Sequence, residues 1–538
     1  MKKDLLFYAL MHLSINMFAQ QDAWIYFTDK PNVQTSITNP ITILTQKAID
    51  RKNAHGVSID ARDVPVNETY ISQLKNATGI TVKAKSKWFN AVHVRGSVTD
   101  INNLKTTFSF VDKIVFADRN LNVTKTVKQK QASKLQTALT TFNYGNATNQ
   151  IQMIKGDQLH VSNYIGTGIT VAVLDAGFPN VNMMASFQRL RNAGNLKGSY
   201  DFVQRDTDVY TNTTSHHGTL VLSTMAGYVE NQFVGTAPDA SYYLFITEDA
   251  PTENPVEESY WVEAAERADS LGVDVINTSL GYTTYDNTNY SYTTSDMDGN
   301  TAFITKGANI AFEKGMLLIN SAGNEGNSSW GIVSAPADAA GVLTIGAVNS
   351  LGNYASFSSR GSNTQSTQKP DVVAQGQASA VINENDVIYT ANGTSFSSPI
   401  MAGGIVCLWQ ALPNKTNAEI MQLVRESASQ YNTPDYFLGY GIPNLQTALN
   451  LALSMEDYKI YDEIKAYPNP TKDLLSFKLP SLNTSYSVKV HNITGKQVLA
   501  STVNKVTNQI NLSSIVDGLY FVTIYSKASN QTFKIIKN

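Results

Sequence analysis

Residues 392–412 read NGTSFSSPIMAGGIVCLWQAL, and this stretch decides the fold of the chain. From residue 400 onward it contains no charged residue, so it is predicted to form a helix that is buried on all sides. Ser395 lies where this helix is expected to begin, and Pro399 is expected within about its first turn, where a missing N–H is tolerated. A buried helix of this kind would hold the hydroxyl at its start in a fixed position.

The hydroxyl of Ser395 is a candidate nucleophile. At a helix N-terminus it lies near free backbone N–H groups and the positive end of the helix dipole, which favours a reaction that creates an oxyanion. The alternative is that Ser395 only caps the helix. A nucleophilic serine needs a base and a group that orients the base, so the upstream sequence distinguishes the two interpretations.

Two upstream stretches supply such groups. Residues 169–174, ITVAVL, form an apolar run that ends at Asp175, which places a carboxylate at the carboxyl end of a buried strand. His217 begins the sequence HGT and precedes an apolar helical pattern. Asp175, His217 and Ser395 are therefore each expected at the end of an element, close to a glycine.

These three motifs resemble those of the subtilisin-like serine proteases, the subtilases of peptidase family S8. The resemblance implies that Ser395 is the nucleophile, His217 the general base and Asp175 the residue that orients the base. Ala176 departs from the family pattern, which more often has serine or threonine after the aspartate. We do not expect this change to abolish activity.

Two further segments also resemble motifs of this family. Residues 321–326, SAGNEG, match the oxyanion motif of the family, which implies that the side-chain amide of Asn324 donates to the oxyanion. Asparagine beside glycine is otherwise ordinary turn chemistry. Ser279, Leu280 and Gly281 match the segment whose backbone pairs with an extended substrate, with an ordinary buried strand end as the alternative.

The stretch from 151 to 455 alternates buried strands with helices and is the predicted catalytic domain. Strands are expected at 273–277, 316–320 and 342–348, and residues 257–271 have helical spacing between strands. This pattern predicts a parallel sheet with crossover helices. The predicted fold class is α/β, a subtilisin-like parallel β-sheet flanked by helices, preceded by a small α+β propeptide and followed by a C-terminal β-sandwich.

Three parts are predicted before the catalytic domain. Residues 1–19 have a basic start, an apolar stretch and a final alanine, which indicates a secretory signal peptide, with a merely hydrophobic N-terminus as the alternative. Residues 20–126 alternate short β-rich runs with polar helices and by position resemble the inhibitory propeptide of the family; an accessory domain is the alternative. Residues 127–150, rich in polar side chains, are the predicted linker and processing region.

Charge is unevenly distributed along a chain whose net charge is −3. Residues 20–126 hold 14 Lys and Arg against 9 Asp and Glu, residues 127–459 hold 16 against 30, and residues 460–538 hold 9 against 4. The acidic middle argues against nucleic-acid binding. The basic N-terminal part is expected to dock on the acidic part through complementary charge.

Residues 460–538 form short alternating strands separated by turns, which is typical of a β-sandwich. The sequence PNP at 468–470, the sequence DGLY at 517–520 and the basic C-terminal end resemble the C-terminal sorting domain of the type IX secretion system of Bacteroidota. That resemblance implies export across the outer membrane and removal of the domain. A carbohydrate- or substrate-binding sandwich is the alternative.

No metal site is predicted. His216 lies beside His217, but neighbouring residues point in different directions and no other histidine is close in sequence. Family members often carry structural calcium, and the aspartates in loops 201–208 and 286–298 could bind it, although no motif fixes a calcium site. The chemistry itself is expected to need no cofactor. Cys407, the single cysteine, is predicted to be a small core side chain.

The predicted function is that of a serine endopeptidase, secreted or at the cell surface, made as a precursor with a removable propeptide and sorting domain. Its expected partners are protein or peptide substrates, its own propeptide and the type IX secretion machinery, with no membrane span. The alternative is a catalytically silent surface binding protein on a protease scaffold. An α/β-hydrolase esterase is disfavoured because its triad runs Ser, Asp, His and its serine lies in Gly-x-Ser-x-Gly.

Overall fold

Seven parallel strands form the central sheet and carry the candidate residues along one edge. The computed structural model describes residues 20–122, 142–211, 213, 215–462, 464–479, 485–504, 506–525 and 530–538. The chain divides into two compact units, Met1–Ala448 and Leu449–Asn538. The predicted signal peptide, 1–19, lies outside the described residues.

The order of the central sheet is β13-β12-β11-β10-β5-β9-β6, and every strand pair is parallel. The strands are β5 (Thr170–Asp175), β6 (Leu196–Asp201), β9 (Ser241–Ile246), β10 (Val275–Thr278), β11 (Leu317–Ser321), β12 (Val342–Val348) and β13 (Val372–Gln375). Five of them, β5 and β10 to β13, are buried along their whole length, as expected for apolar strands covered on both faces. The three strands predicted after β5 are confirmed to within two residues.

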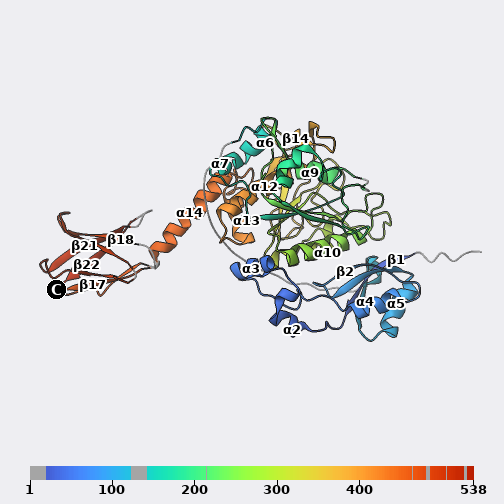
Figure 1. Cartoon of the computed structure of the whole chain (residues 1–538), viewed down its shortest axis with the longest axis horizontal. Coiled ribbons are helices and arrows are strands. Elements are labelled where there is room, and N and C mark those ends of the chain that lie inside the picture. The colour runs from blue at the N-terminus through green and yellow to red at the C-terminus, as the bar shows by residue number, and fades with distance from the viewer. Residues whose placement is uncertain are drawn as a thin grey trace, which may run out of the picture. The chain divides into compact units, whose positions relative to one another are not determined.

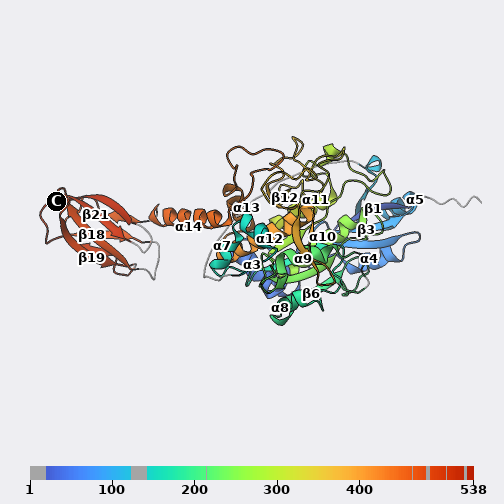
Figure 2. The same cartoon turned by 90° about the horizontal axis from the view of Figure 1, so that it is seen from above.

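Helices cover both faces of this sheet, as Figure 1 shows, and Figure 2 gives the same elements seen from above. α9 (His217–Ala226) and α12 (Thr394–Ala411) pack against each other on one face, and α10 (Val256–Leu271) and α11 (Phe303–Glu313) pack against each other on the other. Every residue of α12 except Gln410 is buried, which confirms the prediction for this stretch. Further α-helices of this domain are α6 (Thr148–Met153), α7 (Gly156–Val161), α8 (Gln188–Asn192) and α13 (Asn417–Glu426).

Two hairpins complete the catalytic domain. β14 (Ser379–Ile382) and β15 (Ile388–Ala391) pair antiparallel directly before α12, and β7 (Tyr228–Val229) pairs with β8 (Phe233–Val234) after α9. Leu220 of α9, Val381 of β14 and Phe396 of α12 share a small apolar cluster. This cluster joins the element that carries His217 to the element that carries Ser395.

The N-terminal domain is a small α+β unit with an antiparallel sheet of order β2-β3-β1-β4. Its elements are β1 (Gln21–Phe27), α4 (Glu68–Lys75), β2 (Thr81–Ser86), β3 (Ala91–Gly96), α5 (Val98–Thr107) and β4 (Val111–Phe116). Side chains of Asn67 and Ser97 cap the two helices by accepting from backbone N–H groups. An insertion between β1 and α4 adds α2 (Val33–Thr38) and α3 (Gln46–Ala54), and α3 lies against the catalytic domain near α10 (Figure 1).

Residues 142–150, the last part of the predicted linker 127–150, are folded onto the catalytic domain. Tyr144 is buried, Asn146 N donates to Gln232 O at 2.8 Å, and α6 begins at Thr148. The folded catalytic domain therefore starts by residue 142. The rest of the linker, up to 141, lies outside the described residues.

The C-terminal unit is a β-sandwich of two antiparallel sheets, as predicted. One sheet has the order β16-β17-β20 and the other β19-β18-β21-β22. The strands are β16 (Lys465–Tyr467), β17 (Leu474–Lys478), β18 (Tyr486–Asn492), β19 (Gln497–Val503), β20 (Gln509–Asn511), β21 (Gly518–Tyr525) and β22 (Asn530–Lys537). Inward side chains of both sheets, such as Phe477 and Val488, form one core. α14 (Leu445–Asp462) contains the boundary between the two units.

Candidate active site

The carboxyl ends of three neighbouring strands bring the candidate residues to one edge of the sheet. Asp175 is the last residue of β5, Ser279 follows β10, and Asn324 follows β11. Because β11, β10 and β5 are adjacent and parallel, these ends lie side by side. Ligands of open parallel sheets bind outside such an edge.

Asp175 and His217 form a hydrogen-bonded pair at this edge. Nδ1 of His217, the first residue of α9, lies 2.7 Å from Oδ1 of Asp175. The backbone N–H of Ala176 donates to the same oxygen at 2.8 Å, while the alanine side chain offers no donor. The carboxylate is 0% exposed and the imidazole 28% exposed, so the ring has one protected side and one side open to solvent.

The environment of His217 changes its pKa. Burial acts to lower this pKa, but the charge of Asp175, its hydrogen bond and the more distant Glu248 outweigh burial and raise it. The direction shows that the imidazolium form is stabilised at this position. An aspartate that stabilises an imidazolium suits a histidine that must take up a proton during a reaction.

Ser395 is the second residue of α12, and its side chain does not cap the helix. The N-cap is Gly393, whose φ of 151° lies in a region that only glycine adopts readily. The capping interpretation of Ser395 is therefore wrong. Its hydroxyl, on a residue 9% exposed, donates to the carbonyl of Ser279 at 3.3 Å, and within the described residues it forms no hydrogen bond with His217. The ring of His217 lies beside that of the next residue, Phe396, with centroids 6.1 Å apart.

Pro399 lies inside α12 rather than in its first turn, because the helix begins at Thr394. The ring removes the N–H that would bond to the carbonyl four residues earlier, which is that of Ser395. This carbonyl instead accepts from the hydroxyl of Ser279 at 2.9 Å. Two hydrogen bonds in opposite directions thus join Ser395 to Ser279.

Asn324 is held through its side-chain oxygen. This oxygen accepts from Thr394 N at 2.9 Å and from Thr394 Oγ1 at 3.1 Å. The Nδ2 group is consequently free of these bonds and lies near Gly393, where a Cβ would be 3.6 Å from it. Thr394 lies seventy residues after Asn324, so these hydrogen bonds are not those of a local turn. They leave the amide N–H₂ of Asn324 beside Gly393, close to the start of α12.

The segment 279–281 continues from β10, and its residues differ in exposure. Ser279 is 5% exposed, while Gly281 is exposed. The carbonyl of Leu280 accepts from the side chain of Asn320 at 3.0 Å. A Cβ on Gly281 would lie 2.1 Å from Oγ of Ser334, so glycine is needed here for packing whether or not a substrate binds. The segment's role in substrate binding stays a prediction.

Glu248 is a neighbour of the Asp175–His217 pair that the sequence motifs do not indicate. It follows β9 at the same edge of the sheet, and its carboxyl accepts from the hydroxyl of Tyr282. Burial raises its pKa to about 8. The signal that could have found it is similar to the one that found Asp175, a carboxylate close to the carboxyl end of a buried strand.

No metal ligands can be assigned at this edge. In the described parts of the chain, no group of three or more His, Cys, Asp or Glu side chains is arranged to hold a metal ion. His216 lies 3.2 Å from Glu384. Asp206 and Asp208, in one of the two predicted calcium loops, accept from nearby backbone N–H groups.

Three family models match successive parts of the chain. The "Peptidase S8 propeptide domain, Bacteroidota" matches residues 22–135, the "Subtilase family" matches residues 166–441, and the "Secretion system C-terminal sorting domain" matches residues 465–538. These matches follow the order in which the N-terminal domain, the parallel sheet and the β-sandwich occur in the structure.

Curated relatives match just over half of the chain. Subtilisin E of Bacillus subtilis (strain 168) is 33% identical over 300 residues, which cover 55% of this chain and 70% of that protein. Subtilisin of Bacillus pumilus is 32% identical over 300 residues, which cover 55% of this chain and 97% of that protein. The chain therefore belongs to the subtilase family of serine proteases, with an S8 propeptide domain before its catalytic domain and a type IX secretion sorting domain after it.

Proposed function

We propose that the chain is the precursor of an exported serine endopeptidase that cleaves proteins through Asp175, His217 and Ser395. The observation that carries the proposal is the 2.7 Å contact between His217 and Asp175, beside the start of the helix that holds Ser395. The raised pKa of His217 supports the same roles. The subtilase family match supports the reaction class.

In the proposed mechanism, Ser395 Oγ attacks the carbonyl carbon of the scissile peptide bond. His217 takes the proton from the hydroxyl and then gives it to the departing amine, while Asp175 orients the ring and stabilises the imidazolium. The Nδ2 group of Asn324 and the backbone N–H of Ser395 donate to the oxyanion that forms on the substrate. Water then repeats the sequence on the acyl-enzyme and regenerates the serine.

One rearrangement is part of this proposal. The hydroxyl of Ser395 must leave the carbonyl of Ser279 and turn toward the imidazole of His217. Catalytic hydrogen bonds are often long or misaligned without substrate and tighten when it binds. The second bond, from the side-chain hydroxyl of Ser279 to the carbonyl of Ser395, does not involve the Ser395 hydroxyl and persists through the rotation.

A fluorophosphonate probe tests the proposal directly. The probe is expected to label the exported protein on Ser395, and casein hydrolysis should stop in proportion to labelling. A catalytically silent scaffold would leave the serine unlabelled. Labelling at another residue with casein hydrolysis intact would refute the assignment of the nucleophile.

Replacing Asn324 with alanine is expected to lower kcat by roughly 10²–10³-fold, a magnitude known from a subtilisin. KM should change little, because the amide acts on charge that is present only in the transition state. Asn324→Asp keeps an acceptor for Thr394 but removes the donor, so it should be at least as impaired. Steady-state kinetics on a peptide substrate measures both, with Asn327→Ala, a surface asparagine, as the control. A rise in KM alone would contradict the oxyanion role.

The activity is expected to fall at acid pH, with a midpoint given by the pKa of His217. The base must be neutral to accept a proton, so kcat/KM is expected to rise with pH through the pKa of His217. Because this pKa is raised, the midpoint should lie above the ordinary value of 6.5. A pH–rate profile gives the midpoint, and His216→Ala should leave it in place. A midpoint below 6.5 in the unmodified enzyme would contradict the proposed environment.

Export and processing form the finer part of the proposal. The sorting domain indicates export, and we place the mature enzyme outside the cell or on its surface. No helix within the described residues is long and apolar enough to cross a membrane.

Since residues 142–150 are folded on the catalytic domain, we place the processing cut before residue 142. Structural calcium stays a prediction, and the proposed chemistry uses no cofactor.

A further inference from the structure

The carboxyl group of Glu248 lies between the Asp175–His217 pair and the segment 279–281. Glu248 comes just after β9, and in the sheet β5 separates β9 from β10, which leads into this segment. The hydroxyl of Tyr282, the residue after the segment, nevertheless donates to Oε1 of Glu248. The bond between these two side chains therefore crosses the end of β5. The Glu248 carboxyl is close enough to Asp175 and His217 for their charges to affect its pKa.

No cationic side chain balances this carboxyl. Among the residues that the structure describes, no lysine or arginine forms an ion pair with Glu248 or with its acidic neighbours Glu253 and Glu257. Burial and the charges of Glu253 and Asp175 raise the pKa of Glu248 to about 8. Burial and the charge of Glu248 likewise raise the pKa of Glu257. The protonated forms are favoured because negative charges meet here without a positive one.

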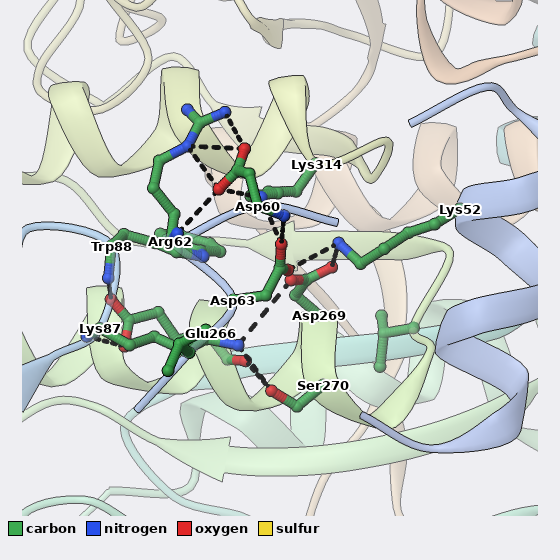
Figure 3. A network of polar contacts seen from close by, with 12 residues as sticks. Lys52, Asp60, Arg62, Asp63, Lys87, Trp88, Glu266, Asp269, Ser270 and Lys314 are labelled. Atoms are coloured by element: carbon green, nitrogen blue, oxygen red, sulfur yellow. Dashed lines mark hydrogen bonds and ion pairs between the residues drawn. The ribbon is translucent and has the colours of Figure 1, made fainter. Parts of the chain in front are cut away.

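Asp269 of α10 shows the effect that cations have on a buried carboxylate (Figure 3). It lies 2.5 Å from Arg51 and 2.7 Å from Lys52. Burial acts to raise its pKa, but the charges of Lys52, Arg51 and Lys87 outweigh burial and lower it. The pKa of Glu248 moves in the opposite direction because the described residues place no such cation beside it. A bound molecule with a positive charge would stabilise the ionised form of Glu248.

The carboxyl of Glu248 is accessible to such a molecule. Glu248 is half-buried, whereas Glu257 and Tyr282 are each 1% exposed. Oε1 accepts from Tyr282, and Oε2 accepts no hydrogen bond from the residues that the structure describes. One oxygen is therefore held in place, and the other is available to a donor.

A peptide paired with the segment 279–281 would direct alternate side chains to the side on which Glu248 lies. Successive side chains of an extended chain point in opposite directions. Asn324, which is proposed to bind the oxyanion, follows β11 on one side of β10, while Glu248 follows β9 on the other. We therefore assign the Glu248 side to the residue that precedes the attacked one, which is the second residue before the cut bond.

We propose that Glu248 is a specificity-determining residue that selects a lysine or arginine side chain at the second residue before the cut bond. The ammonium or guanidinium group donates to Oε2 and supplies the positive charge that is missing beside Glu248. The proposal rests on the proposed function, since it needs a peptide bound along 279–281. The chain itself offers a matching substrate. Residues 123–141, in which the proposed processing cut lies, contain four lysines and no aspartate or glutamate.

Matched peptides measure this preference. The substrates differ only at the second residue before the cut bond, which is lysine, norleucine or glutamate. About one pH unit above the pKa of Glu248, the exported enzyme should show a kcat/KM roughly 10-fold or more higher for the lysine peptide than for the norleucine peptide. The glutamate peptide should be the poorest substrate. Moving the lysine to the first or the third residue before the cut bond should abolish the gain.

Three variants identify the group responsible. Glu248→Gln removes the charge but keeps an acceptor for Tyr282, and it should reduce the lysine-to-norleucine ratio of kcat/KM to within about twofold of unity. Tyr282→Phe removes the hydrogen bond but keeps the charge, so the ratio should remain high. Glu253→Gln is the matched control, because it removes an exposed charge from the same connection between β9 and α10 and should keep most of the ratio. Circular dichroism verifies that each variant is folded.

Each outcome decides the inference. A lysine peptide cleaved no faster than the norleucine peptide, or a gain that appears at another position, would overturn it. A high ratio in Glu248→Gln, or an equal fall in Glu253→Gln, would overturn the role of Glu248. A failure of the proposed function is distinguishable, because Ser395 would then stay unlabelled and no peptide would be cleaved, which overturns both proposals. A labelled serine without a lysine preference overturns this inference alone.

Discussion

Replacing Ser395 with alanine should reduce peptide hydrolysis roughly 10⁶-fold, the magnitude measured when the nucleophile of a subtilisin is removed. The loss is this large because the base and the orienting carboxylate act only through the serine oxygen. The residual rate should come from Asn324 and substrate binding. Turnover of a chromogenic peptide measures the effect. If processing is autocatalytic, the variant precursor should also remain uncut on a denaturing gel.

Ser397→Ala is the matched control for this substitution. Ser397 lies two residues later in α12, is buried, and donates to the carbonyl of Thr394 at 3.1 Å. It therefore reports the cost of losing a hydroxyl from the same helix without losing the nucleophile, and it should retain most of the activity. If both variants lost activity equally, the defect would lie in the helix and not in the chemistry of Ser395.

Asp175→Asn should lower kcat roughly 10⁴-fold, as the equivalent change does in serine proteases. The amide can hold the imidazole of His217 in the wrong tautomer, and it no longer stabilises the imidazolium. A second readout follows from the charge. Because Asp175 raises the pKa of His217, its neutralisation should move the acid limb of the residual activity to lower pH. Kinetics across a pH series measures both effects.

The control for this variant is Asp201→Asn. Asp201 is the last residue of β6, at the same edge of the sheet, and accepts from Val203 N and Gln204 N. Replacing the Asp201 carboxylate tests whether the loss of any carboxylate at the end of a strand lowers the activity. An unchanged acid limb in Asp175→Asn, or an equal loss of activity in Asp201→Asn, would contradict the role proposed for Asp175.

The parallel sheet could be predicted because its strands carry an unambiguous local signal. Strands buried on both faces need continuous apolar, β-branched runs, and residues 169–174 and 342–348 show such runs. The ends of these strands could be predicted for the same reason. Asp175 stands out because it follows its run directly, whereas Asn324 was predicted only from the match of residues 321–326 to the oxyanion motif of the family.

The start of α12 was harder to place. A serine at a predicted helix start, such as Ser395, suggests an N-cap. The N-cap is instead Gly393, two positions earlier, and the helix therefore begins at Thr394. This shift of the start moves Pro399 into the helix interior. The orientation of the Ser395 hydroxyl was not predictable either, because it depends on Ser279, over one hundred residues away.

The stretch 45–63 of the N-terminal domain shows why charged stretches mislead. Its lysines, arginines and aspartates are typical of a solvated surface, and nothing nearby in the sequence marks them as buried. Their partners are more than two hundred residues away. The overall charge asymmetry indicated that the two domains attract each other, but not which residues meet.

The proline in α12 has a consequence for how this enzyme could acquire new substrate preferences. Because Pro399 leaves the main-chain carbonyl of Ser395 without its helical donor and the Ser279 hydroxyl binds that carbonyl, Ser395 is tied directly to the start of the segment 279–281. Under the proposed function, altering that segment to admit a different peptide would also shift the hydroxyl of Ser395. Variation in preference is therefore easier to achieve on the loops around this edge than on the segment tied to the helix.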